Sequence, residues 1–235
     1  MFVVAVAYSA VGHGGGSGYL AVMALLSVAP PVMKPAALFL NVLVASVGSI
    51  RYLADRRFSW SAFWPFAITS IPCAFIGGRL DLPARLYKQV MGVVLVYSAY
   101  RLWRSTSRSG SEAISPPPLP QAASCGAAIG FVSGMIGVGG GIFLSPLLIL
   151  FRWAETRAVS GVSALFILVN SIAGLAGARV GIADFPPSVG VWAGAVLAGG
   201  LLGSWLGSRK LEVVHIRRLL GIVLLVAALK LLAGV

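Results

Sequence analysis

The chain has 235 residues, of which 58% are hydrophobic and 10% charged, and its mean hydropathy is +0.94. A soluble domain carries about 25% charged residues, so this composition excludes a soluble globular protein and predicts a multi-pass membrane protein. The net charge is +12, from 18 Lys and Arg against 6 Asp and Glu. No basic stripe interleaved with aromatics lies outside the apolar segments, which argues against nucleic acid as a partner. The cations stand mostly at segment ends, where they meet membrane lipid headgroups.

Taken in order, the chain contains about eight apolar segments. They cover residues 2–28, 35–54, 60–80, 87–103, 122–151, 158–178, 187–207 and 216–233. No basic region precedes the first of them, so we expect it to remain as a membrane segment instead of being cleaved as a signal peptide. Residues 105–121 are rich in Ser and Pro and predict a polar linker. The linker separates a first repeat, residues 1–104, from a second, residues 122–235.

A glycine-rich signature interrupts the first apolar segment of each half. It reads GHGGG at residues 12–16 and GVGGG at residues 137–141. Glycine costs about 1 kcal/mol relative to alanine inside a helix, so the helix should break at both places. In a membrane, such a break is tolerated mainly where it lines a cavity. We therefore interpret the two signatures as halves of one solute site.

Several other positions repeat between the halves. At a common offset of 129 residues, Asn170 matches Asn41, Gly203 and Gly207 match Ala74 and Gly78, Gly221 matches Gly92, and Lys230 matches Arg101. The glycine signatures are offset by 125 residues. An internal duplication explains these matches better than chance.

The relative direction of the two halves depends on whether each glycine segment crosses the membrane or returns to the same side. If both cross, Lys and Arg divide ten to eight between the two sides, and if both are re-entrant they divide twelve to six. The twelve are Arg51, Arg56, Arg57, Arg101, Arg104, Arg108, Arg152, Arg157, Arg209, Lys210, Arg217 and Arg218. The sharper division favours inverted repeats, with both termini outside and the linker in the cytoplasm.

Residues 130–148, GFVSGMIGVGGGIFLSPLL, resemble the hallmark of the TauE/SafE family of sulfite exporters, and residues 36–41, AALFLN, are similar to its first-half pattern. The resemblance covers essentially the whole chain. It implies a secondary transporter in the bacterial inner membrane, which exports small sulfur-containing anions such as sulfite, sulfonates or related organic acids. His13 departs from the pattern, because the family has a small aliphatic residue there.

A sulfite or sulfonate site needs hydrogen-bond donors without a large fixed charge. Backbone N–H groups at the start of a half-helix supply such donors, and glycines let the anion approach them. Residues 14–18 and 139–142 would form two opposed cradles, with hydroxyls from Ser9, Ser17 and Ser133. The candidate substrate-binding residues are Gly12, His13, Gly14, Gly15, Gly16, Ser17, Asn41, Ser133, Gly137, Gly139, Gly140, Gly141 and Asn170. The alternative is close packing, since glycines four residues apart let helices approach without a ligand.

His13 is the ionisable residue of the first broken segment and a candidate for proton coupling, because its unperturbed pKa of about 6.5 allows a change of charge near neutral pH. The alternative is a neutral histidine bonded to a backbone carbonyl.

The favoured function is alternating-access transport of a small sulfur anion. An anion channel, or a transporter of another small organic anion, remains an alternative. An enzyme is not expected, because no HExxH, GxSxG or P-loop motif and no carboxylate pair within the segments is present. Cys73 and Cys125 stand apart without a CxxC, so neither a metal nor a cofactor is expected. The small size is compatible with a homodimer.

Overall fold

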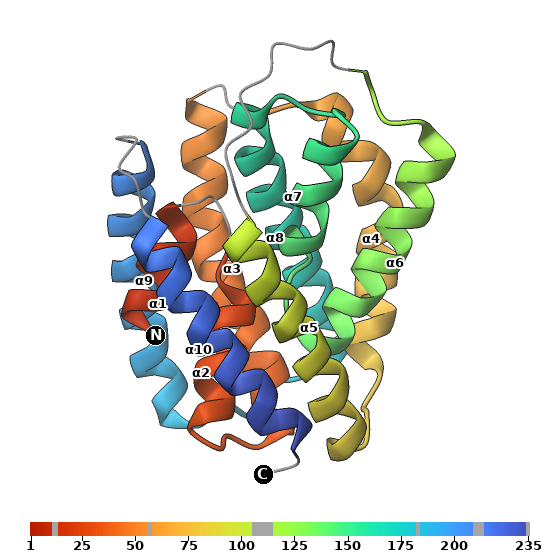
Figure 1. The fold of residues 1–235 in the computed structure, drawn as a ribbon. Coiled ribbons are helices and arrows are strands. Elements are labelled where there is room, and N and C mark those ends of the chain that lie inside the picture. Colours follow the sequence, from red (N-terminus) through yellow and green to blue (C-terminus); the bar gives the residue numbers. More distant parts are fainter. Residues whose placement is uncertain (11–13, 56–57, 105–114, 182–183, 209–213, 234–235) are drawn as a thin grey trace.

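The computed structural model describes residues 1–10, 14–55, 58–104, 115–181, 184–208 and 214–233. These residues form ten helices and no strand, as the composition predicts. The helices are α1 (Phe2–Ala10), α2 (Gly16–Leu25), α3 (Pro30–Ala54), α4 (Trp60–Arg79), α5 (Ala84–Arg104), α6 (Leu119–Ile136), α7 (Gly141–Leu150), α8 (Thr156–Ala178), α9 (Pro187–Ser208) and α10 (Val214–Leu232). They pack side by side in one bundle (Figure 1).

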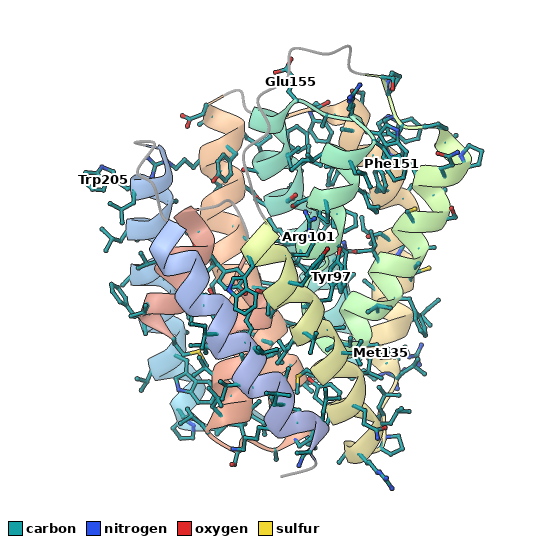
Figure 2. The ribbon with its side chains drawn as sticks, in the orientation of Figure 1. Tyr97, Arg101, Met135, Phe151, Glu155 and Trp205 are labelled. Carbon is teal, nitrogen blue, oxygen red and sulfur yellow. The ribbon has the colours of Figure 1, made fainter. Side chains whose placement is uncertain are left out.

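Five described helices are long and apolar enough to cross a membrane. These spans are Pro30–Ala54, Trp60–Arg79, Leu119–Ile136, Ala158–Ala178 and Pro187–Leu206. Figure 2 shows Trp205 projecting outward from α9 and Phe151 near the upper end of the bundle, where its ring stacks on Trp153 with centroids 4.7 Å apart. Aromatic side chains at such places are typical of membrane interfaces. The polytopic helical class is confirmed, whereas the count of about eight apolar segments in two repeats stays a prediction.

Both glycine signatures interrupt a helix. Gly15 stands before the first residue of α2 with φ 86°, and Gly140 stands before the first residue of α7 with φ 87°. Gly137 and Gly139 also have positive φ, 96° and 80°. L side chains rarely adopt this left-handed conformation, so the glycines explain why the chain can turn here. Gly12 and His13 lie outside the described residues.

The second broken segment enters and leaves the bundle at the same end. In Figure 1, α6 runs down from the upper end and α7 runs back up to it. The N–H of Ser115, before α6, donates to the carbonyl of Arg152, after α7, over 3.3 Å. At 1.5 Å per residue α6 is about 27 Å long and α7 about 15 Å. In the same figure α1 runs upward and α2 returns to the lower end.

Close helix contacts join the two halves, and glycines make several of them possible. Three glycines of α6, Gly126, Gly130 and Gly134, face the backbone of α4, where a Cβ on any of them would overlap the carbonyl oxygens of Phe66, Ser70 and Ala74 respectively. On the other side of the bundle, Gly199 and Gly203 of α9 meet α1 in the same way. Gly126 and Gly130 therefore serve close helix packing, and Gly78 of α4 meets the backbone of Gly174 in α8 in the same way.

We expect Gly130→Val to destabilise the bundle by roughly 3 kcal/mol, because the new side chain must displace the backbone of α4. Thermal unfolding of the detergent-purified protein, followed by tryptophan fluorescence, measures the effect. Gly190→Val is the control, since nothing lies within 4 Å of a Cβ at Gly190. Equal midpoints for the two variants would contradict the close contact of α4 with α6.

Candidate functional site

The side chain of Asn41, in α3, lies where the two glycine signatures meet. It is fully buried, and its Nδ2 donates to the carbonyl of Gly137 over 3.4 Å. A Cβ on Gly16 would lie 2.5 Å from Nδ2, and one on Gly139 would lie 3.1 Å from it. A Cβ on Gly14 would lie 3.4 Å from Oδ1. Glycines from both halves thus surround one amide.

Ile167 of α8 fills the space on the other side of these glycines. A Cβ on Gly14 or on Gly139 would lie 2.8 Å from its Cγ2, and one on Gly141 would overlap its Cδ1. The two signatures also touch directly, because a Cβ on Gly16 would lie 2.6 Å from the carbonyl oxygen of Val138. Any larger residue at these positions would force the two breaks apart, which is a steric reason for the run of glycines.

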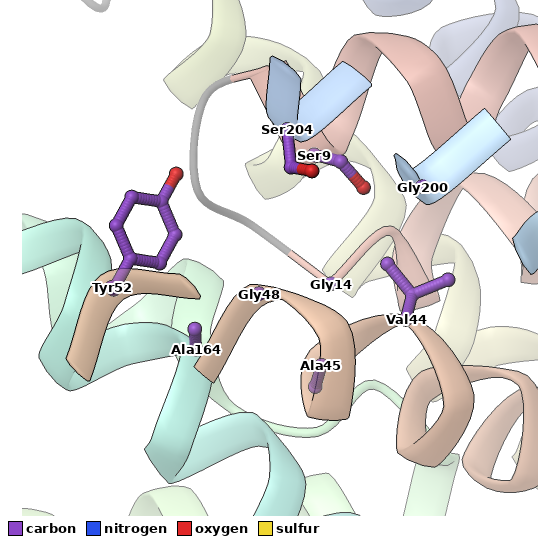
Figure 3. A pocket seen from close by; sticks show the side chains of 9 residues that line it. All are labelled: Ser9, Gly14, Val44, Ala45, Gly48, Tyr52, Ala164, Gly200 and Ser204. Atoms are coloured by element: carbon purple, nitrogen blue, oxygen red, sulfur yellow. The ribbon is translucent and has the colours of Figure 1, made fainter. Parts of the chain in front are cut away.

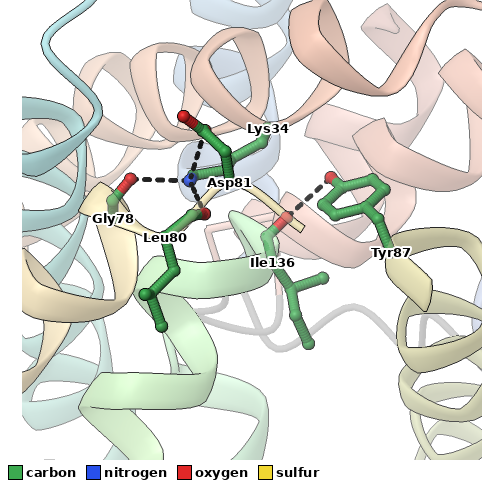
Figure 4. Close-up of polar contacts among 6 residues, drawn as sticks. All are labelled: Lys34, Gly78, Leu80, Asp81, Tyr87 and Ile136. Carbon is green, nitrogen blue, oxygen red and sulfur yellow. Dashed lines mark hydrogen bonds and ion pairs between the residues drawn. The ribbon is translucent and has the colours of Figure 1, made fainter. Parts of the chain in front are cut away.

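The carbonyls at the end of α6 are taken up by side chains. The hydroxyl of Tyr87 in α5 donates to the carbonyl of Ile136 over 2.9 Å (Figure 4), and Asn41 holds the carbonyl of Gly137. At the start of α7 the carbonyl of Gly140 accepts from Phe143 and Leu144. The first N–H groups of a helix have no acceptor within it and carry the positive end of its dipole. The carbonyls of Ile136, Gly137 and Gly140 are therefore satisfied, and the first N–H groups of α7 face the break as donors that suit an anion.

Two buried hydroxyls flank the second break. A Cβ added to Gly140 would lie 2.7 Å from Ser133 Oγ, and a Cβ added to Gly139 would lie 3.0 Å from Ser171 Oγ. Both serines are fully buried, and neither hydroxyl has a hydrogen-bond partner within the described part of the chain. Ser133 was predicted from the sequence. Ser171 was not, because its counterpart in the first half, at the offset of 129, is Val42.

Two predicted residues have other partners. The hydroxyl of Ser17 is 2.9 Å from the hydroxyl of Tyr8, so it is already hydrogen-bonded. Asn170 accepts a hydrogen bond from Ser70 of α4, and its Nδ2 has no partner among the described residues. No described contact joins Asn170 to either break. Gly15 caps α2 in the left-handed conformation, and a Cβ there would lie 2.7 Å from the ring of Tyr19.

The nearest described cation to the second break points away from it. The backbone of Lys34 in α3 packs on Gly137, but its Nζ donates to the carbonyls of Gly78, over 2.6 Å, and Leu80, over 2.9 Å (Figure 4). Asp81 lies 4.0 Å from the same ammonium. Among the described residues, no group of His, Cys, Asp and Glu could hold a metal ion. The described donors at the break are therefore neutral.

Known proteins are similar to this chain over much of its length. The model of the sulfite exporter TauE/SafE family matches residues 1–231. The chain belongs to this family. The chain is 42% identical to a probable membrane transporter protein of Sinorhizobium fredii over 234 residues, which cover 98% of this chain and 95% of that protein. It is 26% identical over 145 residues to a probable membrane transporter protein of Methanocaldococcus jannaschii, covering 59% of this chain and 52% of the relative. No solved structure matches the chain. Family membership and the apolar helices make it a multi-pass membrane transporter.

We expect Asn41→Leu to lower the stability of the protein by about 1–3 kcal/mol, because the buried carbonyl of Gly137 loses its donor. The thermal unfolding midpoint of the purified protein measures the loss. Ser46→Ala is the control on the same helix, since Ser46 Oγ bonds only to the carbonyl of Val42 in its own helix. An Asn41→Leu midpoint equal to that of Ser46→Ala would show that Asn41 does not hold the break.

Proposed function

We propose that the protein is a secondary transporter that exports small sulfur-containing anions, such as sulfite or organosulfonates. The observation that carries the proposal is the meeting of both glycine breaks at Asn41, where side chains hold the carbonyls of Ile136 and Gly137 and the buried hydroxyls of Ser133 and Ser171 have no described partner. An oxyanion at the start of α7 would accept from the first N–H groups of that helix and from the hydroxyls of Ser133 and Ser171. Membership of the sulfite exporter family supports the sulfur-containing substrate class.

We further propose that the two halves are inverted repeats. Five described helices precede the linker and five follow it, and Gly15 and Gly140 have φ values of 86° and 87°. The contact of α4 with α6 has its counterpart in the contact of α9 with α1. Helices at corresponding places run in opposite directions in Figure 1: α3 upward and α8 downward, α4 downward and α9 upward. These directions support a pseudo-two-fold axis in the membrane plane.

The charges support an orientation with the upper end of Figure 1 in the cytoplasm. Six cations stand near the ends of α3, α4, α5, α8 and α10 that lie lowest in Figure 1: Lys34, Arg79, Arg85, Lys88, Arg179 and Lys230. If both glycine segments are re-entrant, the other twelve of the 18 Lys and Arg fall on the opposite side of the membrane. The positive-inside rule assigns the richer side to the cytoplasm. This orientation places the polar linker in the cytoplasm.

We expect Ser133→Ala and Ser171→Ala each to raise the KM for sulfite or taurine by roughly tenfold, because a hydrogen bond to a charged group contributes about 1.5 kcal/mol. Gly140→Leu should abolish transport. Flux of labelled substrate in proteoliposomes measures both effects. Ser124→Ala, an exposed serine of α6, is the control and should transport like the wild type. Absence of flux for every sulfur anion would refute the proposed substrate class.

His13 is proposed to couple transport to a proton on the strength of its place between Gly12 and Gly14 in the sequence. A protonated imidazole beside the first break would attract the anion and release it on deprotonation. We expect a pH gradient to accelerate wild-type flux and to have no effect on His13→Ala. His215→Ala is the control, since the sequence has two histidines. A gradient that accelerates His13→Ala as strongly as the wild type would remove the histidine from the coupling step.

A further inference from the structure

A small cavity lies between α1, α3, α8 and α9, next to the first break (Figure 3). About 10 Å³ is open to the centres of water molecules, which is room for about one water. Its wall consists largely of small residues, among them Gly14, Gly48 and Gly200. Since a Cβ on Gly14 would lie 3.4 Å from Asn41 Oδ1, one wall of the cavity is also a wall of the candidate site. The cavity therefore adjoins the site on the side of the upper end.

Polar groups line this cavity although it lies among apolar helices. The side chain of Ser9 is 7% exposed, and its hydroxyl has no partner in the described part of the chain. Ser204 lies beside it on the same wall (Figure 3). Nη1 of Arg51, next to the lining residue Tyr52, donates to Ser204 Oγ over 3.3 Å. A buried hydroxyl without a partner is costly, so Ser9 points to a ligand that enters the cavity.

We propose that this cavity is the closed cytoplasmic entrance to the anion site, with Arg51 and Ser204 as its gate. The inference rests on the proposed export of a small anion. The guanidinium of Arg51 is a planar fork of donors that matches an oxyanion. An arriving anion replaces Ser204 as one acceptor of Arg51, and the hydroxyl of Ser9 donates to it further in. The glycines let α3, α8 and α9 approach closely enough to shut the path afterwards.

Filling the cavity tests the entrance without disturbing the fold. A Cβ on Gly48 would lie 3.6 Å from Ala164 Cβ, and one on Gly200 would lie 3.4 Å from Val44, both ordinary contacts. Alanine also favours the helix, so both variants should fold at least as well as the wild type. We expect Gly48→Ala and Gly200→Ala to reduce flux severalfold. Gly194→Ala, on the exposed side of α9 with nothing within 4 Å, should leave it unchanged.

Equal flux in the cavity variants and in Gly194→Ala would overturn the proposed entrance. A severalfold reduction that is confined to the cavity variants, with unchanged unfolding midpoints, supports it.

Chemical labelling tests the side and the charge of the entrance independently of flux. Ser9→Cys, made with Cys73→Ala and Cys125→Ala, is treated with sulfonatoethyl or trimethylammonioethyl methanethiosulfonate in inverted and right-side-out vesicles. We expect labelling from the cytoplasmic face, roughly tenfold faster for the anionic reagent because of the Arg51 charge. Arg51→Gln should remove this preference and Arg51→Lys should retain it. Labelling only from the opposite face, or none from the cytoplasmic face, would overturn the proposal.

The two proposals fail in different ways. Cytoplasmic labelling of Ser9→Cys without wild-type flux of any sulfur anion would refute the substrate class and leave the entrance. Wild-type flux without cytoplasmic labelling would refute the entrance and leave the transport function.

Discussion

A helix that breaks inside a membrane must find new partners for its freed backbone groups, and this constraint governs the centre of the structure. At the end of α6 the new partners are side chains from two other helices. Tyr87 donates to the carbonyl of Ile136, and Asn41 donates to that of Gly137. Because these two carbonyls are used and the first N–H groups of a helix have no acceptor within it, the start of α7 offers donors to the break. The helices α3 and α5 thus lie where their side chains can donate to the carbonyls that the end of α6 leaves without a partner in the helix.

The sequence allows glycine two roles, a helix break that lines a site and close helix packing. In the structure different glycines take these two roles. Gly126, Gly130 and Gly134 face the backbone of α4, so they serve helix contact alone. Four signature glycines, Gly14, Gly16, Gly139 and Gly141, lie instead around the buried amide of Asn41 and the side chain of Ile167. Four-residue spacing is the same in both cases, which is why spacing could not distinguish them. The positive φ of Gly137, Gly139 and Gly140 does distinguish them, because a packing glycine inside a helix needs no left-handed conformation.

Composition and glycine content were sufficient to predict the helical membrane class and the places of the breaks, but not all residues around them. Asn41 and Asn170 occupy equivalent places in the sequence, yet Asn170 is bonded to Ser70. Ser70 corresponds to Gly199 in the second half, 129 residues later. Because glycine has no hydroxyl to bond Asn41, the amide of Asn41 donates to the carbonyl of Gly137 instead. Ser171 and Ile167 carry no repeat or spacing signal. Their place next to the glycines depends on how α8 packs, which the sequence pattern does not encode.

The two ends of the bundle are closed by different kinds of contact. At the lower end the buried ammonium of Lys34 makes hydrogen bonds of 2.6 and 2.9 Å to the carbonyls of Gly78 and Leu80, with Asp81 4.0 Å away. Charge-assisted bonds of this length are among the strongest in proteins, and breaking them would leave a buried charge. At the upper end Nη1 of Arg51 donates to Ser204 over 3.3 Å, beside a cavity whose wall consists largely of small residues. The lower end is thus held by a buried charge, whereas the upper end also depends on the close approach of helices at small residues.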